Sequence, residues 1–146
     1  MGKVFLAYVT LLTAVFSFRY LGLTLSSLDD NWLAVEHNLR RAGGKWRRLT
    51  KILGREERDK ITTGRFYMAV VQAVLLFGSD KRVLKPRLEK SLAGFHHWAA
   101  RQMTVMVPKH HIDGTWVYPP IGATMAMVGL EEIMVSIACR QNTVAQ

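Results

Sequence analysis

The chain has 146 residues, of which 49% are hydrophobic, and it carries a formal net charge of +9 at pH 7. This length is that of about one domain, the apolar fraction excludes a chain disordered throughout, and the single cysteine excludes an internal disulfide and fits a reducing, intracellular compartment (cytoplasm or nucleus). The charge points to a polyanionic partner, nucleic acid before an anionic membrane, or else to a surface that is basic without any bound partner.

The N-terminal segment, residues 1–17, is apolar. Val4 to Phe18 carries no charge and lies between Lys3 and Arg19. It is shorter than the about twenty residues that a membrane-spanning helix needs. A basic start followed by an apolar run and small residues is typical of a signal peptide. A buried strand or helix of a domain is the other interpretation, favoured by the basic, cysteine-poor chain that follows.

Residues 18–26 (FRYLGLTLS) alternate between two faces, which predicts a strand. Gly22 indicates a bulge or the close approach of another backbone. The residues after it, Ser26 to Asp30, are typical of a turn that leads into a helix N-cap, where carboxylates are favoured by the helix dipole.

An amphipathic helix is predicted from Asp30 to Leu53. Apolar residues spaced by three or four form one stripe: Trp32, Val35, Leu39, Ala42, Trp46, Leu49 and Leu53. Six basic residues lie off it: Arg40, Arg41, Lys45, Arg47, Arg48 and Lys51. This basic face can bind phosphates above the anchoring tryptophans, or it can simply be a solvated helix face. Gly43 and Gly44 weaken the helix by about 1 kcal/mol each relative to Ala and are expected to kink it.

The stretch Thr62 to Ser79 is almost wholly apolar. Thr62 or Thr63 is expected to cap a helix that Gly78 ends. A helix that is apolar nearly all round must be buried, so we expect the other helices to wrap around it. A short apolar run such as Val70 to Phe77 also fits a strand, but the length and the caps favour a helix.

Two further helical segments follow. Pro86 fits the first turn of a helix that reaches about Met106, with Leu84, Leu88, Leu92, Phe95, Ala99 and Met103 as its apolar stripe. Lys109 to Pro120 is predicted to be a loop with a turn at Asp113–Gly114. Residues 121–144 are predicted to be helical with a break at Gly129.

The expected fold is mainly α, with a short N-terminal strand or hairpin before a bundle of three to five helices. We divide the chain into residues 1–17, 18–107 and 108–146, the last being a loop with a helical extension.

No residues form a recognisable catalytic or metal site. Asp29–Asp30 is interpreted as a helix cap. His96, His97, His110 and His111 are expected to be exposed to solvent or to contact phosphate, because adjacent residues on a helix point about 100° apart and no ligand of zinc-site spacing lies near them. Cys139 is expected to be a small packed residue. We therefore expect no catalytic residue, no metal and no cofactor.

Several segments resemble one known family. FRYLGLTLSS resembles the segment after the palm in reverse transcriptases of LINE-type (non-LTR) retrotransposons, where Phe-X-Tyr-Leu-Gly belongs to the primer-grip hairpin. GRFYMAVVQAVLLFGS resembles the thumb helix of that family, and LEKSLAGFHHWAARQM resembles its next helix. GTWVYPP and RQNTVAQ match the region beyond the thumb in one branch of such elements. The resemblance extends over residues 18–146, and the order and spacing of the motifs carry it.

The resemblance implies a role for each segment. Phe18, Tyr20, Leu21 and Gly22 fall on the primer-grip motif. The three predicted helices (residues 32–53, 64–77 and 86–106) fall on the thumb, which lies against a template–primer duplex, so the six basic residues would face its backbone. Fingers and palm, with their metal-binding aspartates and Tyr-X-Asp-Asp motif, have no counterpart before Phe18. We therefore expect a truncated RNA-directed DNA polymerase fragment that has no activity alone and binds nucleic acid non-specifically.

A different class of function is also compatible with the sequence. The chain would then be a small basic protein that is membrane-associated or exported through Val4–Phe18. A thumb without its palm would expose apolar surface, so self-association is a further expectation.

Overall fold

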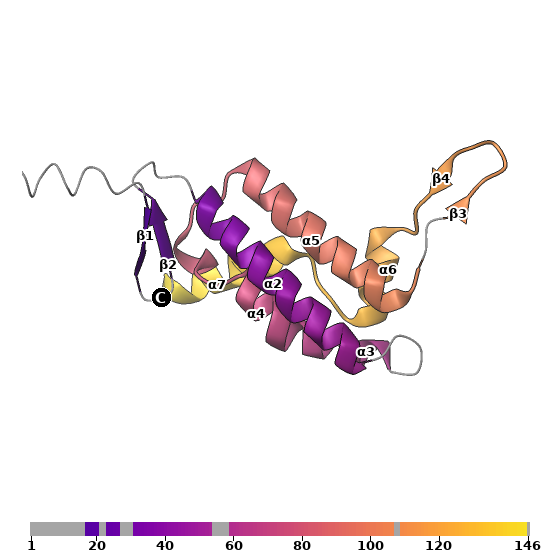
Figure 1. The fold of residues 1–146 in the computed structure, drawn as a ribbon, viewed down its shortest axis with the longest axis horizontal. Coiled ribbons are helices and arrows are strands. Elements are labelled where there is room, and N and C mark those ends of the chain that lie inside the picture. The colour runs from indigo at the N-terminus through magenta and orange to yellow at the C-terminus, as the bar shows by residue number, and fades with distance from the viewer. Residues whose placement is uncertain (1–16, 21–22, 27–30, 54–58, 107–108, 146) are drawn as a thin grey trace, which may run out of the picture.

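The computed structural model describes residues 17–20, 23–26, 31–53, 59–106 and 109–145, and the description below concerns these residues. They form a mainly helical bundle with a small N-terminal antiparallel hairpin, as expected, and a second small hairpin that was not predicted (Figure 1). The predictions for the apolar N-terminal segment and for Asp29–Asp30 concern residues outside these ranges.

The first hairpin replaces the single strand predicted for residues 18–26. Strands β1 (Ser17–Tyr20) and β2 (Leu23–Ser26) pair antiparallel, with Phe18 opposite Leu25 and Tyr20 opposite Leu23. The prediction of one continuous strand was therefore wrong, and the hairpin alternative is confirmed. Gly22 lies between the two strands, outside the described residues.

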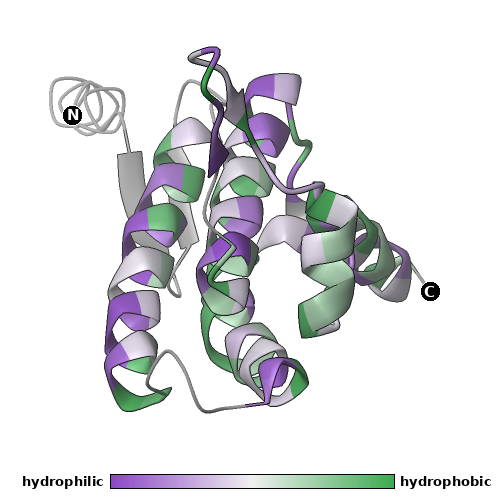
Figure 2. Cartoon of the chain, turned by 90° about the vertical axis from the view of Figure 1, so that its right-hand side faces the viewer, coloured by the Kyte–Doolittle hydropathy of each residue, from purple (hydrophilic) through white to green (hydrophobic). Residues whose placement is uncertain are grey.

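Two long helices, α2 (Trp32–Leu53) and α5 (Pro86–Thr104), form much of the bundle. Their predicted apolar stripes line the core, where Trp46, Leu49, Leu88 and Leu92 are buried. Hydrophilic and hydrophobic residues accordingly alternate along the helices of the bundle (Figure 2). The expected weakness at Gly43–Gly44 does not interrupt α2, which remains α-helical through both glycines.

The central apolar segment is helical but not uniform. It consists of α3 (Lys60–Phe66), the π-helical turn η1 (Tyr67–Gln72) and α4 (Ala73–Leu75). The N-cap is Asp59, whose carboxylate accepts a hydrogen bond from the backbone N–H of Thr62 (2.9 Å). The expectation that Thr62 or Thr63 caps this helix was therefore wrong. The predicted left-handed conformation of Gly78 is confirmed, with φ of 74°, but the helix itself ends at Leu75, with Leu76 as its C-cap.

This segment is buried on one side only, so the expectation that it is buried all round was wrong. Its inner side carries Tyr67, Val71 and Leu75, all at most 2% exposed. Its outer side leaves five large apolar residues more than a third exposed: Ile61, Phe66, Met68, Val70 and Phe77. The other helices cover only the inner side, which is where α2, α5 and the later helix α6 (Ile121–Val128) pack.

The chain ends in α6 (Ile121–Val128) and α7 (Ile133–Val144), separated at Gly129 as predicted. Gly129 has a φ of 65°, which favours glycine. Polar contacts fix α7 to the rest of the bundle. The buried Gln72 amide donates to Ser136 Oγ (3.0 Å), and the Gln141 amide donates to the carbonyls of Ser79 and Arg82 in and beside the short 3-10 turn η2 (Ser79–Lys81).

Candidate nucleic-acid interface

The six basic residues predicted to contact phosphate all lie on the outer side of α2. We call this set the α2 ridge: Arg40, Arg41, Lys45, Arg47, Arg48 and Lys51, each of them exposed. At about 100° per residue, their positions span an arc of about 160°, most of which lies away from the buried residues of α2, with Lys45 at the edge nearest to them. The structure therefore brings the six predicted residues together on one surface.

The apolar stripe holds the ridge in place from below. Trp46 is only 3% exposed and packs edge-on against Tyr67, with ring centroids 5.7 Å apart. Trp32, at the start of α2, is half-buried, and the guanidinium of Arg87 lies 4.2 Å from its ring centroid. The expectation that the tryptophans anchor this helix is confirmed for Trp46. A rigid support lowers the entropy that the ridge would lose on binding a partner.

Within α2 itself, one carboxylate accompanies the ridge. Arg40 Nη2 donates to Glu36 Oε1 at 2.7 Å, one turn earlier on the same helix. Between Glu36 and the end of α2 the sequence contains no other carboxylate. The positive potentials of neighbouring cations add, so the ridge is a continuous basic surface.

The four residues on the primer-grip-like motif are separate from the ridge. Phe18 and Tyr20 lie in β1, and β2 packs beside α2. Leu21 and Gly22 lie outside the described residues. The hairpin is thus next to the helix that carries the ridge.

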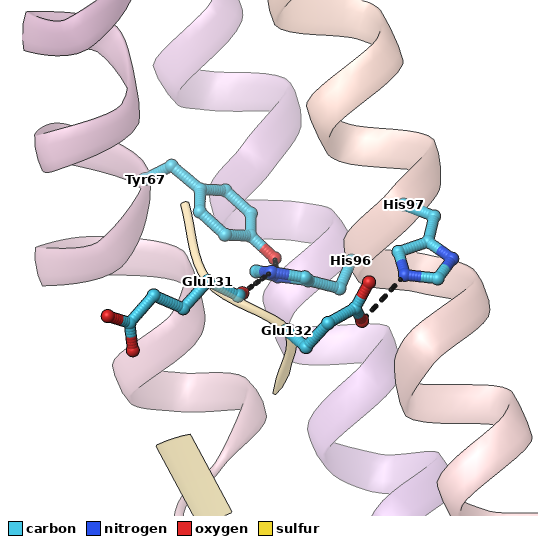
Figure 3. A network of polar contacts seen from close by, with 5 residues as sticks. All are labelled: Tyr67, His96, His97, Glu131 and Glu132. Atoms are coloured by element: carbon cyan, nitrogen blue, oxygen red, sulfur yellow. Dashed lines mark hydrogen bonds and ion pairs between the residues drawn. The ribbon is translucent and has the colours of Figure 1, made fainter. Parts of the chain in front are cut away.

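The prediction for the adjacent histidines of α5 was wrong for His96, which is fully buried. Its Nε2–H donates to the main-chain carbonyl of Glu131 (2.9 Å), so in the neutral ring Nδ1 accepts from the Tyr67 hydroxyl (2.9 Å). Figure 3 shows His96 between these two partners. We call Tyr67, His96 and the Glu131 carbonyl the buried polar seam. It joins η1, α5 and the segment before α7.

Burial controls the protonation of the seam. Desolvation lowers the pKa of His96 below its ordinary value, and it raises the pKa of Tyr67. The neighbouring His97 is half-buried and pairs with the Glu132 carboxylate at 3.0 Å. The other two histidines, His110 and His111, are exposed as expected. His96 is therefore a neutral structural residue, and neither ring of the α5 pair is free to contact phosphate.

No metal site forms among the residues that the structure describes, since no three His, Cys, Asp or Glu side chains come together there. An open depression of about 370 Å³ lies between η1 and α7, lined by Met68, Gln72, Glu131, Val135, Ser136, Cys139 and Arg140. Cys139 is exposed at its edge, so the expectation of a packed cysteine was wrong. It lies on the outer side of α7, whose inward-facing residues are Ile133 and Ile137.

In the described part of the chain, no single helix is both long and apolar enough to cross a membrane. The pair α6 and α7 together has the length and composition, but it bends by 61° at its break.

The sequence did not indicate a surface formed by the segment predicted as a loop. Residues 109–117 form a second hairpin, β3 (Lys109–His110) with β4 (Trp116–Val117), around the predicted Asp113–Gly114 turn. Trp116 and Tyr118 are each 58% exposed. The sequence signal that could have indicated this surface is a Trp and a Tyr two residues apart beside a predicted turn.

Comparison with known proteins gives no relative: no family model, no curated protein and no solved structure matches this chain.

Proposed function

We propose that this chain binds the sugar–phosphate backbone of nucleic-acid duplexes through the α2 ridge, as a thumb-like remnant of a LINE-type reverse transcriptase. The observation that carries the proposal is the exposure of six basic side chains on one side of α2, away from the stripe that fixes the helix in the core. Arg and Lys side chains that contact phosphates position a protein on a duplex without reading its sequence. The expected binding is therefore sequence-independent and sensitive to salt.

The order of the elements supports the proposed origin. The resemblance implies a hairpin followed by thumb helices, and the chain has β1–β2, then α2, then the α3–η1–α4 segment that ends shortly before Gly78, then α5. The proposal includes no polymerase reaction by the chain alone. Such a reaction needs carboxylates that hold two metal ions, and no Tyr-X-Asp-Asp motif occurs in the sequence.

The test is the affinity for a labelled RNA–DNA duplex, measured by fluorescence anisotropy at increasing salt. If about five phosphates are neutralised, log K falls with log salt with a slope of about −4.5. The variant Arg40→Gln/Arg47→Gln/Arg48→Gln/Lys51→Gln should bind more weakly, with a slope shallower by about 3.6 if all four residues contact phosphates.

A matched control removes the same charge elsewhere. Lys60, Arg65, Lys85 and Lys90 are also exposed but lie outside α2, and their replacement by Gln should leave the slope near that of the parent chain. Equal losses in the two variants would mean that net charge, and not the ridge, is responsible. No binding of the duplex by the parent chain at low salt would refute the proposal altogether.

A further inference from the structure

The β3–β4 hairpin projects from the bundle at the end of α5 (Figure 1). Lys109 pairs with Val117 and His110 with Trp116. The turn is closed by hydrogen bonds, because His111 N–H donates to the Thr115 carbonyl (2.8 Å). In addition, Asp113 Oδ1 accepts from the backbone N–H (3.0 Å) and the hydroxyl (2.7 Å) of Thr115. The hairpin therefore has a defined shape although it packs on little else.

Its side chains are of the kind that folded proteins usually bury. Trp116 and Tyr118 are each 58% exposed, whereas Trp46 and Tyr67 in the bundle are at most 3% exposed. The His110 ring meets Trp116 edge-on, with centroids 4.8 Å apart, which supports the indole from one side. Two aromatic rings open to solvent, Trp116 in β4 and Tyr118 directly after that strand, indicate a contact surface for a partner.

Cations accompany these rings. Lys109 is exposed in β3, and the Arg101 guanidinium at the end of α5 lies 5.8 Å from the Tyr118 ring centroid. Asp113 is the only carboxylate between Lys109 and Tyr118, and Thr115 occupies one of its oxygens with two hydrogen bonds. A flexible polyanion with planar groups fits this arrangement better than an apolar groove of another protein, because the chain as a whole carries a charge of +9.

We propose that the β3–β4 hairpin binds single-stranded nucleic acid by stacking unpaired bases on Trp116 and Tyr118, while Lys109 and Arg101 contact the phosphates. Every base has an aromatic face, so such stacking tolerates any sequence. This surface is distinct from the α2 ridge, which is proposed to bind duplex backbone. The two inferences together describe a chain that binds a duplex on one surface and an unpaired strand on another.

The experiment uses the full chain with labelled oligo(dT) and oligo(U) 12-mers, and with the RNA–DNA duplex in parallel. Trp116→Ala and Tyr118→Ala should each weaken single-strand binding by roughly 5- to 150-fold, the range of one lost stacking contact, and should leave duplex binding unchanged. Trp116→Phe and Tyr118→Phe should retain most of the affinity, because they keep an aromatic face. Quenching of tryptophan fluorescence on addition of oligo(dT) should be lost with Trp116→Phe.

The matched control is Ile112→Ala, which removes a fully exposed apolar side chain from the same hairpin without removing a ring. It should bind the 12-mers like the parent chain. An equal loss with Ile112→Ala, or no loss with either aromatic-to-Ala variant, would overturn the proposal. The proposal would also be overturned if the parent chain bound none of the 12-mers. If, in that case, the aromatic-to-Ala variants abolished self-association in sedimentation, the hairpin would be a contact between proteins. If the α2 ridge variant keeps full duplex affinity while Trp116→Ala still weakens single-strand binding, only the proposed function fails.

Discussion

The buried polar seam and the α2 ridge are both polar regions of a helical bundle, but they find their partners in different places. In the seam, the Tyr67 hydroxyl, both nitrogens of His96 and the Glu131 carbonyl are all paired within the chain. On the ridge, Arg40 alone forms an ion pair with a carboxylate, Glu36, among the pairs that the described residues make. A polar group that loses its partner inside the bundle stays buried without a hydrogen bond, and the protein loses the full desolvation energy of that group. An exposed cation on the ridge is hydrated and can exchange that water for a phosphate. Substitutions in the seam should therefore change stability, and substitutions on the ridge should change binding.

The largest difference in stability is expected between two glycines, one in the bundle interior near the seam residue Tyr67 in the chain and one among the ridge residues. Gly64 in α3 faces α6, and a methyl group there would collide with the backbone carbonyl of Val128. Gly44 lies among the ridge residues of α2, and a methyl group would meet nothing within 4 Å. Gly64→Ala should therefore destabilise by about 1–3 kcal/mol or more, because backbone must move. Gly44→Ala should stabilise by up to about 1 kcal/mol through helix propensity.

Urea denaturation of both variants measures this contrast. Gly44→Ala should leave the duplex affinity of the ridge unchanged, since it adds no charge and displaces no side chain. If Gly64→Ala were as stable as the parent chain, the close packing of α3 on α6 would be wrong.

Sequence patterns predicted the helices of this fold more reliably than they predicted which sides of those helices are covered by other parts of the chain. The stripe from Trp32 to Leu53 fixed both the buried face of α2 and the position of the six basic residues, because a regular period links sequence to direction in space. The burial of the central segment was overestimated. Composition indicates how much apolar surface a helix can bury, but which of its sides is covered depends on where α2, α5 and α6 pack.

The buried role of His96 could not be read from the sequence for a similar reason. Its partners, Tyr67 and Glu131, lie 29 and 35 residues away, so only the tertiary fold brings them together. Periodicity did place His96 one residue after Phe95 of the α5 stripe, which is compatible with either an inward or an outward ring. The exposure of Trp116 and Tyr118 was missed because a loop prediction does not indicate which side chains of the loop are buried.

Acid should weaken the seam before it affects the ridge. Burial lowers the pKa of His96 below 6.5, so the unfolded chain takes up a proton at a higher pH than the folded chain does. The contribution of His96 is therefore fully present above about pH 6.5. As the pH falls from that value toward the folded pKa, the free energy of unfolding should decrease by up to about 1.4 kcal/mol per pH unit. Other groups near the ring are Tyr67, His97 and Glu132, and they remain in place in the comparison below.

Urea denaturation between about pH 7.5 and pH 4.5 should be compared for the parent chain and for His96→Gln, which keeps one N–H toward the Glu131 carbonyl but does not titrate. The difference between the two stability curves isolates His96. It should be nearly flat above about pH 6.5 and should shrink below that pH, because only the parent chain loses the contribution of His96. A difference that does not change with pH would mean that this ring is not buried in its neutral form.

The smallest effect on stability is expected at the one ion pair of the ridge. Glu36→Gln removes the partner of Arg40, and since both side chains are more than a third exposed, the free energy of unfolding should fall by at most about 0.5 kcal/mol. The same change frees Arg40 and removes the one carboxylate of α2, so the affinity for the RNA–DNA duplex should rise, with a salt slope steeper by up to about 0.9. Glu89→Gln in the first turn of α5 changes the net charge equally but lies off α2, and it should raise the affinity less. An equal rise for both variants would show that overall charge governs binding, whereas a greater rise for Glu36→Gln would identify Arg40 as a phosphate contact that the chain itself holds back.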